Sequence, residues 1–108
     1  MVVKEIKSLE EFHSIIKAND KVVLDCYATW CGPCRIISPV FEKLSESEEF
    51  QDKAQFYKFD VDEIPKLAEE LGVRAMPTFY FFNGGNKVGD MVGADPRGLA
   101  AHLTKYVG

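Results

Sequence analysis

The stretch that most constrains this fold runs from Asp25 to Cys34 and reads DCYATWCGPC. An apolar run over 22–24 leads into it, and apolar side chains recur with helical spacing over 36–44 after it. The two cysteines, Cys31 and Cys34, are therefore predicted to lie where a buried strand passes into a helix. A C-x-x-C pair at such a junction indicates redox chemistry more specifically than the pair alone, which could equally form half of a zinc site.

The spacing of the two cysteines suits a bond that is made and broken. Side chains three positions apart on a helix have Cβ atoms about 5–6 Å apart, whereas a disulfide needs about 3.5–4.5 Å. Cys31 at an unwound helix start, followed by Gly32, lets the chain close this gap, and Pro33 suits a first turn because no N–H is needed there. The ring would span only four residues. The chain-entropy formula then gives about 2 kcal/mol, which is low for a structural bridge.

The predicted helix start also assigns different roles to the two sulfurs. Unpaired N–H groups and the positive end of the helix dipole favour a thiolate at this position. We therefore expect Cys31 to be the exposed nucleophile. Cys34, about one turn further into the helix, is expected to be shielded and to react second.

Asp25 is the unusual residue of the strand predicted over 21–27, which has the pattern of a strand covered on both faces. An ionised carboxylate in that setting costs several kcal/mol, so burial is expected to raise the pKa of Asp25. A carboxylate with such a pKa suits a proton acceptor that works near neutrality. The alternative is an aspartate at a frayed strand end with its carboxylate in water.

The motif from Trp30 to Cys34, WCGPC, resembles the active site of the thioredoxin family, and the resemblance extends over essentially the whole chain. It implies a redox-active disulfide between Cys31 and Cys34. It also implies that Asp25 takes the proton of Cys34 in the second step. In the family a cis-proline packs against the disulfide, and this feature carries over to Pro77.

The resemblance further implies a substrate surface around Cys31. The side chains expected to line it are those of Trp30, Met76, Pro77, Gly93 and Ala94. The exposed backbone of Met76 would pair with an extended segment of the substrate, which is a form of strand addition.

Three residues near the motif leave alternatives open. Lys58 stands where thioredoxins have a lysine near the buried aspartate, and its charge would oppose the effect of burial on Asp25, so the net direction is undecided. Cys26 departs from the family, which usually has an aromatic residue there; it is either an inert buried thiol or a regulatory oxidation site. Arg35 would favour a thiolate and acidic partners, or it would only be solvated.

The order of predicted elements is β-α-β-α-β-α-β-β-α within a single domain, 1–108. The predicted strands cover 2–6, 21–27, 55–61, 78–82 and 87–92, and the predicted helices begin near Ser8, Cys34, Asp62 and Asp95. Pro39 is expected to kink the second helix. Asp62 is expected to cap the third helix, and Gly72 is expected to end it. This order predicts the α/β class with a central mixed sheet of about five strands and about four helices on both faces, which is the layout of the thioredoxin fold.

Composition and charge argue against several other classes. The net charge is −4, which disfavours binding to nucleic acid because phosphates would be repelled. The chain lacks the apolar core of a signal peptide and any run near the length of a membrane span, so a cytoplasmic location without membrane contact is expected. A metal site is not expected, because no second C-x-x-C or histidine pair accompanies His13. We expect a monomer.

The resemblance implies a protein-disulfide reductase, that is, a thiol–disulfide oxidoreductase with oxidised protein disulfides as substrates. It implies no bound cofactor, since electrons would come from NADPH through a thioredoxin reductase. The alternatives are a non-catalytic binding module whose thiols only report redox state, and a metal-binding protein.

Overall fold

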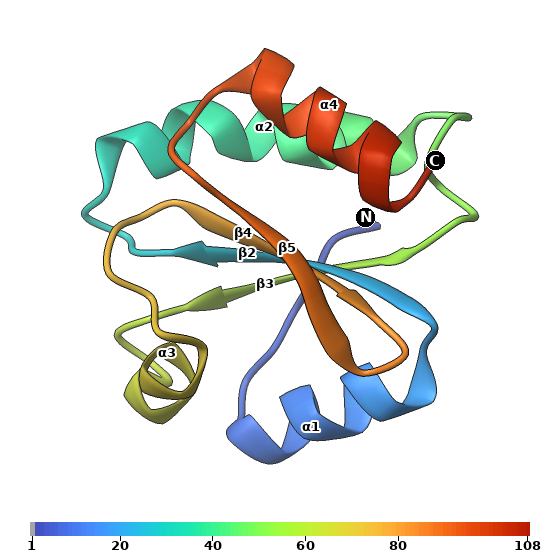
Figure 1. The fold of residues 1–108 in the computed structure, drawn as a ribbon. Helices are drawn as coiled ribbons and strands as arrows, with labels where there is room; N and C mark the ends of the chain where they lie inside the picture. Colours follow the sequence, from blue (N-terminus) through green and yellow to red (C-terminus); the bar gives the residue numbers. More distant parts are fainter. Residues whose placement is uncertain (1) are drawn as a thin grey trace.

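A five-stranded mixed sheet forms the centre of the molecule, and helices cover both of its faces (Figure 1). The computed structural model describes residues 2–108. Along the chain the elements are β1 (Lys4–Glu5), α1 (Leu9–Ala18), β2 (Lys21–Tyr27), α2 (Gly32–Glu46), β3 (Gln55–Asp60), α3 (Pro65–Leu71), β4 (Thr78–Asn83), β5 (Asn86–Val92) and α4 (Pro96–Tyr106). This is the predicted order, with a shorter first strand and a second helix that begins two residues earlier.

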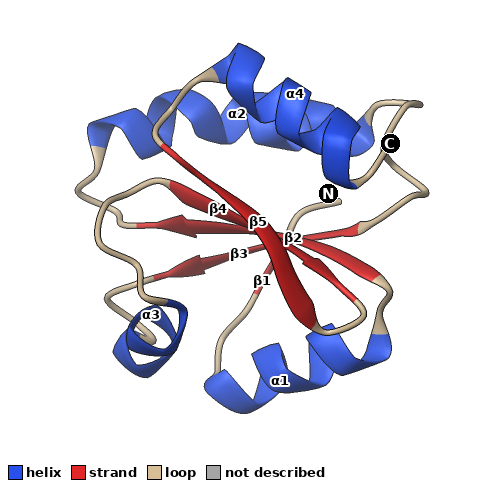
Figure 2. Ribbon diagram, viewed as in Figure 1, coloured by secondary structure: helices blue, strands red, loops and turns tan. Residues whose placement is uncertain are grey.

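The strands lie in the order β1-β3-β2-β4-β5, with β1, β3 and β2 parallel and β4 and β5 antiparallel to their neighbours (Figure 2). The register pairs Glu5 with Lys58 and Lys58 with Asp25, so these three charged residues lie side by side on one face. The carboxyl ends of β2 and β3 reach the edge where α2 begins and where the connection from α3 to β4 passes (Figure 1).

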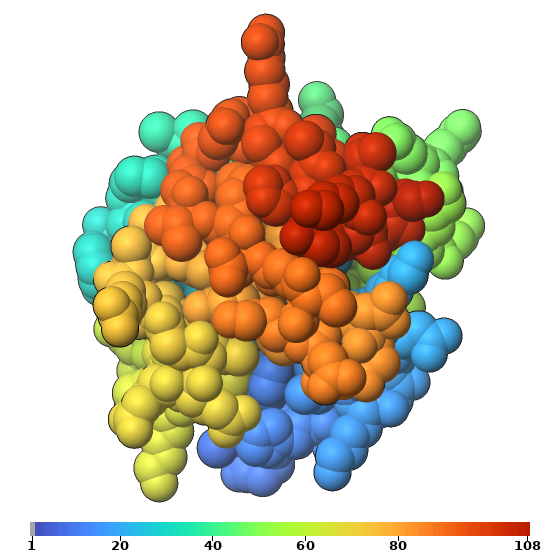
Figure 3. Space-filling model, in the orientation of Figure 1, coloured from blue at the N-terminus to red at the C-terminus, as the bar shows by residue number. Residues whose placement is uncertain are grey.

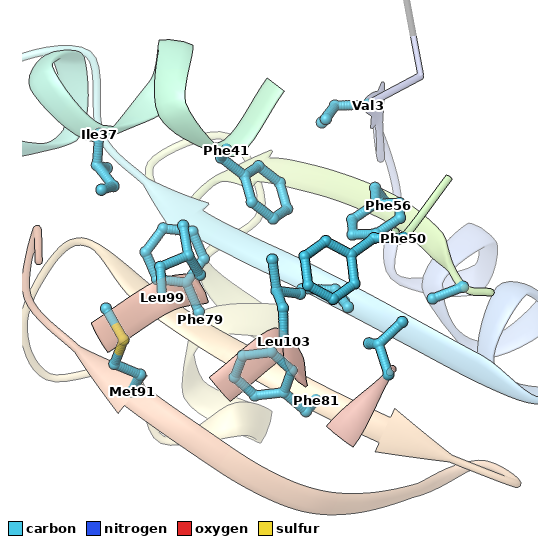
Figure 4. Close-up of a cluster of buried hydrophobic side chains, with 13 residues drawn as sticks. Val3, Ile37, Phe41, Phe50, Phe56, Phe79, Phe81, Met91, Leu99 and Leu103 are labelled. Atoms are coloured by element: carbon cyan, nitrogen blue, oxygen red, sulfur yellow. The ribbon is translucent and has the colours of Figure 1, made fainter. Parts of the chain in front are cut away.

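Two apolar cores hold the layers together. The larger core lies between the sheet and the pair α2 and α4, where Phe41 contacts Phe56 and Phe79 with ring centroids 5.9 and 5.3 Å apart (Figure 4). The second core lies on the opposite face, under α1 and α3, and includes Phe12 and Leu67. Because β2 is central, its side chains are buried on both faces, as the absence of strict apolar–polar alternation in its sequence predicted.

The predicted side-chain caps are present at the starts of α1 and α4 and absent at the start of α3. The Ser8 hydroxyl caps α1 by accepting the N–H of Glu11 at 3.1 Å, and the Asp95 side chain caps α4. Asp62 does not cap α3, contrary to prediction: α3 begins at Pro65, and no side chain of the described residues caps it. The reason is that residues 61–63 form a turn after the end of β3, so the Asp62 carboxylate is not placed at the first turn of α3.

The β4–β5 hairpin turns through Gly84 and Gly85, whose φ angles of 60° and 86° are in the left-handed region that favours glycine. The hairpin and α4 cover one side of the molecule (Figure 3). There the ring of Tyr106 lies over Gly89, in the space a side chain at that position would occupy. None of the helices within 2–108 is long and apolar enough to cross a membrane.

Phe41→Ala is expected to lower the free energy of unfolding by about 3–5 kcal/mol, because it removes a fully buried ring from the larger core. Ile36→Ala on the same helix is the matched control, since Ile36 is 70% exposed and should change stability by less than about 0.5 kcal/mol. Denaturant unfolding of both variants measures the difference. Equal losses for the two would contradict the assignment of Phe41 to the core.

Candidate active site

The two cysteines lie at the start of α2, just after the loop that follows β2. Cys31 is the residue that precedes α2, and its Sγ accepts a hydrogen bond from the N–H of Cys34 at 3.2 Å. The structure joins Cys31 and Cys34 in a disulfide, with Cα atoms 5.3 Å apart. One unpaired N–H group of the first helical turn, that of Cys34, thus points at the sulfur of Cys31, which is an arrangement that stabilises a thiolate.

The burial of Cys31 differs from the prediction. Cys31 is 5% exposed and Cys34 is 4% exposed in this disulfide form, so the expected contrast between an exposed and a shielded sulfur is wrong here. Cys31 is covered because Met76 packs against it, with the Met76 carbonyl oxygen 3.6 Å from Sγ. The two residues differ instead in what lies beside them: Cys34, but not Cys31, lines a pocket of about 450 Å³.

Asp25 lines the same pocket as Cys34, together with Lys58. Asp25 is 2% exposed, and its Oδ1 has no hydrogen-bond partner among residues 2–108. It is paired with neighbours on both sides of β2, which rules out a frayed strand end. Burial raises the pKa of Asp25 to about 7, and the opposing effect of the Lys58 charge is the smaller one.

The Met76–Pro77 peptide bond is cis, as the resemblance implied. The Gly93 N–H donates to the Pro77 carbonyl oxygen at 2.9 Å, which fixes the 93–94 segment beside this bond. Gly93 has φ of 106°, a conformation that a side chain would strain. The distant segments 76–77 and 93–94 are therefore held together next to the disulfide, on the C-terminal side of the parallel strands.

An exposed apolar surface accompanies these segments. Trp30 is 66% exposed, and its indole N–H donates to Asp62 Oδ2 at 2.8 Å, which fixes the ring at the surface. Val92, which precedes Gly93, is 62% exposed. The sequence reasoning missed both Asp62 and Val92. Alternation along β5 was a usable signal for Val92, because it shares a face with Asp90, whereas no local signal pointed Asp62 toward Trp30.

The remaining sequence candidates have defined environments. The Arg35 guanidinium donates to the Thr29 carbonyl oxygen at 2.7 Å, which braces the loop before Cys31. Cys26 is fully buried among the side chains under α1 and α3, and burial followed by the charge of Asp25 raises its pKa, so it remains a thiol. His13 forms a surface pair with Glu70 at 2.8 Å. Within 2–108 no three side chains are grouped to hold a metal ion.

Comparison with known proteins extends these observations. The family model described as Thioredoxin matches residues 3–105. Thioredoxin Asp f 29 of Aspergillus fumigatus is 56% identical over 91 residues, which cover 84% of this chain and 82% of the relative. The crystal structure of the Malassezia sympodialis thioredoxin aligns with a TM-score of 0.92 and 48% identity, over 98% of this chain and 91% of that one.

A third likeness comes from work on how a yeast mitochondrial 1-Cys peroxiredoxin is resolved through the glutathione and thioredoxin systems. That structure aligns with a TM-score of 0.88 and 41% identity, over 95% of this chain and 94% of the other. Fold, cysteine pair and relatives together define a thiol–disulfide oxidoreductase with a redox-active disulfide. The chain belongs to the thioredoxin family.

Asp25→Asn is expected to stabilise the protein at alkaline pH. Because burial raises the pKa of Asp25 from 3.8 to about 7, the folded chain keeps a proton between these values that the unfolded chain releases. Stability of the parent therefore falls as pH rises through this window, and it does not fall further above it. Near pH 8.5 the free energy of unfolding of the variant should exceed that of the parent by about 2–4 kcal/mol, and near pH 3 the two should differ little. Denaturant unfolding at both pH values measures this, and a gain that is equal at the two would contradict it.

Proposed function

We propose that this protein is a protein-disulfide reductase that is recycled by an NADPH-dependent thioredoxin reductase. The observation that carries the proposal is the N–H of Cys34 donated to the sulfur of Cys31, with Asp25 on the pocket that Cys34 lines. Membership of the thioredoxin family supports the same conclusion.

In the first step, the thiolate of reduced Cys31 attacks one sulfur of a partner disulfide. A new sulfur–sulfur bond joins Cys31 to the partner, and the second partner sulfur leaves as a thiolate. The thiolate is the reactive form of cysteine, and the helix N-terminus favours it at Cys31. The partner approaches from the side of Met76, whose carbonyl oxygen is near Cys31.

In the second step, Cys34 releases the partner. Asp25 accepts the proton of Cys34, whose thiolate then attacks the sulfur of Cys31, and the reduced partner leaves with the electron pair of the broken bond. A carboxyl group with a pKa of about 7 is matched to this transfer near neutral pH. Lys58, which lies across the β2–β3 register from Asp25, supports the ionised form.

The substrate surface consists of the apolar groups around the disulfide. Its members are Trp30, Met76, Pro77, Gly93 and Ala94, to which the exposed Val92 is added. An extended partner segment pairs with the backbone of Met76, while the fixed indole of Trp30 contacts its side chains. Recognition through backbone and apolar contacts fits many different partner proteins.

Re-reduction of the disulfide requires two electrons, which NADPH supplies through thioredoxin reductase, so no cofactor resides on this chain. The protein acts as a monomer in the cytoplasm. The cysteine pattern supports a reducing compartment, because the disulfide spans four residues and Cys26 is a free thiol. Coupled reduction of insulin disulfides by NADPH, thioredoxin reductase and this protein tests the whole scheme.

Replacement of each cysteine should separate the two steps. Cys31→Ser removes the nucleophile and is expected to reduce coupled insulin reduction to background. Cys34→Ser keeps the nucleophile but cannot release it, so mixed disulfides between Cys31 and partners should accumulate and be visible by mass spectrometry. Cys26→Ser is the control and should keep full activity. Normal turnover by Cys34→Ser would overturn the scheme, and partner binding without either cysteine would favour a non-catalytic binding module.

Asp25→Asn should slow the second step selectively. Loss of a positioned proton acceptor is expected to lower the rate of mixed-disulfide resolution at pH 7 by about 10-fold or more, with a smaller effect on the first attack. Single-turnover mixing of the reduced protein with a labelled disulfide peptide follows both steps. Equal resolution rates in parent and variant would remove Asp25 from the mechanism.

A further inference from the structure

The sheet places a lysine between two carboxylates. Lys58 on β3 is paired with Glu5 on β1 and with Asp25 on β2, and the three share the face that α2 covers. Among residues 2–108 no carboxylate oxygen lies within 4.0 Å of the Lys58 ammonium. The Lys58 charge is therefore not committed to an ion pair with either Glu5 or Asp25, and its effect on each depends on how the other side chains hold these two carboxylates.

Tyr27 holds the competing carboxylate in place. Its hydroxyl donates to Glu5 Oε2 at 2.5 Å, and its ring lies under the Lys58 ammonium, which is 5.8 Å from the ring centroid. Tyr27 also lines the pocket that contains Asp25, Cys34 and Lys58. Burial, and then the hydrogen bond to Glu5, raise the pKa of the Tyr27 hydroxyl, so it stays a donor at every pH at which the protein would work.

We propose that Tyr27 and Glu5 are positioning residues for the second step. The Tyr27 hydroxyl holds the Glu5 carboxylate away from Lys58, so that the Lys58 charge is directed to Asp25. This inference rests on the proposed role of Asp25 as proton acceptor, and it adds Tyr27 and Glu5 to the residues that support that role. Without the hydroxyl, the Glu5 carboxylate would turn toward Lys58, its neighbour in the parallel register, and would neutralise part of the charge that acts on Asp25.

The other titratable and charged groups near Asp25 are held by other partners or face away from it. On α2, Cys34 is tied in the disulfide and the Arg35 guanidinium is held by the Thr29 carbonyl oxygen. On β2, Cys26 faces the opposite core.

On β4, the residue paired with Asp25 is the apolar Phe79. The charges of Asp60 and Glu63 raise the pKa of Tyr27, whereas the only charge that shifts the pKa of Asp25 among the described residues is that of Lys58. On the solvent side, the Lys7 ammonium lies 3.6 Å from Glu5 and 3.7 Å from Glu63. Lys58 is thus the charged group whose displacement toward Glu5 would change the pKa of Asp25.

The test is a titration of Asp25 by carbon NMR in the oxidised protein, with labelled aspartate and without substrate. In Tyr27→Phe the midpoint of Asp25 is expected to rise by about 0.5 pH unit, because less of the Lys58 charge favours the carboxylate. In the double variant Tyr27→Phe with Glu5→Gln the competitor is neutral, and the midpoint should return to that of the parent. In a Lys58→Met background, Tyr27→Phe should have no further effect.

Tyr57→Phe is the matched control, since Tyr57 precedes Lys58 on β3 but contributes to the opposite core, and it should leave the midpoint unchanged. An unchanged midpoint in Tyr27→Phe would overturn the proposal, as would a rise that persists after Glu5→Gln or Lys58→Met. Because the titration needs no turnover, it is decided independently of whether the protein reduces disulfides. If the protein reduces disulfides, the pH profile of mixed-disulfide resolution should shift in the same direction in Tyr27→Phe.

Discussion

The hydrogen bond from the backbone N–H of Cys34 to the sulfur of Cys31 is the interaction on which the site depends. It exists because a helix leaves its first N–H groups unpaired, and because β2 delivers Cys31 to that position. β2 can do so reliably since it is the central strand, paired with β3 on one side and β4 on the other. The rigid sheet therefore sets the position of the sulfur, and the helix sets its electrostatic environment.

The site also carries a cost that the fold tolerates. Asp25 is buried with an oxygen that has no hydrogen-bond partner in the part of the chain that the structure describes, and such groups destabilise folded proteins when ionised. The aromatic cores on the two faces of the sheet supply the opposing stabilisation. The charge of Lys58 moderates the effect of burial without cancelling it, which leaves the pKa of Asp25 at about 7. A carboxyl group that was fully paired would be more stabilising and less suited to accept a proton.

Local patterns predicted much of this molecule because their causes are local. The cap at Ser8 depends on a residue three positions away, and the turn through Gly84 and Gly85 depends on their own φ angles. The predictions that were wrong depend on distant residues. Cys31 is covered by Met76, and Asp62 binds the indole of Trp30, so neither burial nor helix capping there could be read from adjacent positions.

The sequence by itself determined the order of elements, the C-x-x-C pair at a strand-to-helix junction and the presence of a carboxylate in a buried strand, because these follow from spacing and periodicity along the chain. Only the tertiary structure decided which groups meet: the 93–94 segment beside Pro77, and Lys58 between Glu5 and Asp25. The physical reason is that strand register in a parallel sheet is set by crossover helices and by the packing of whole faces. A shift of one residue would turn Lys58 to the other side of the sheet.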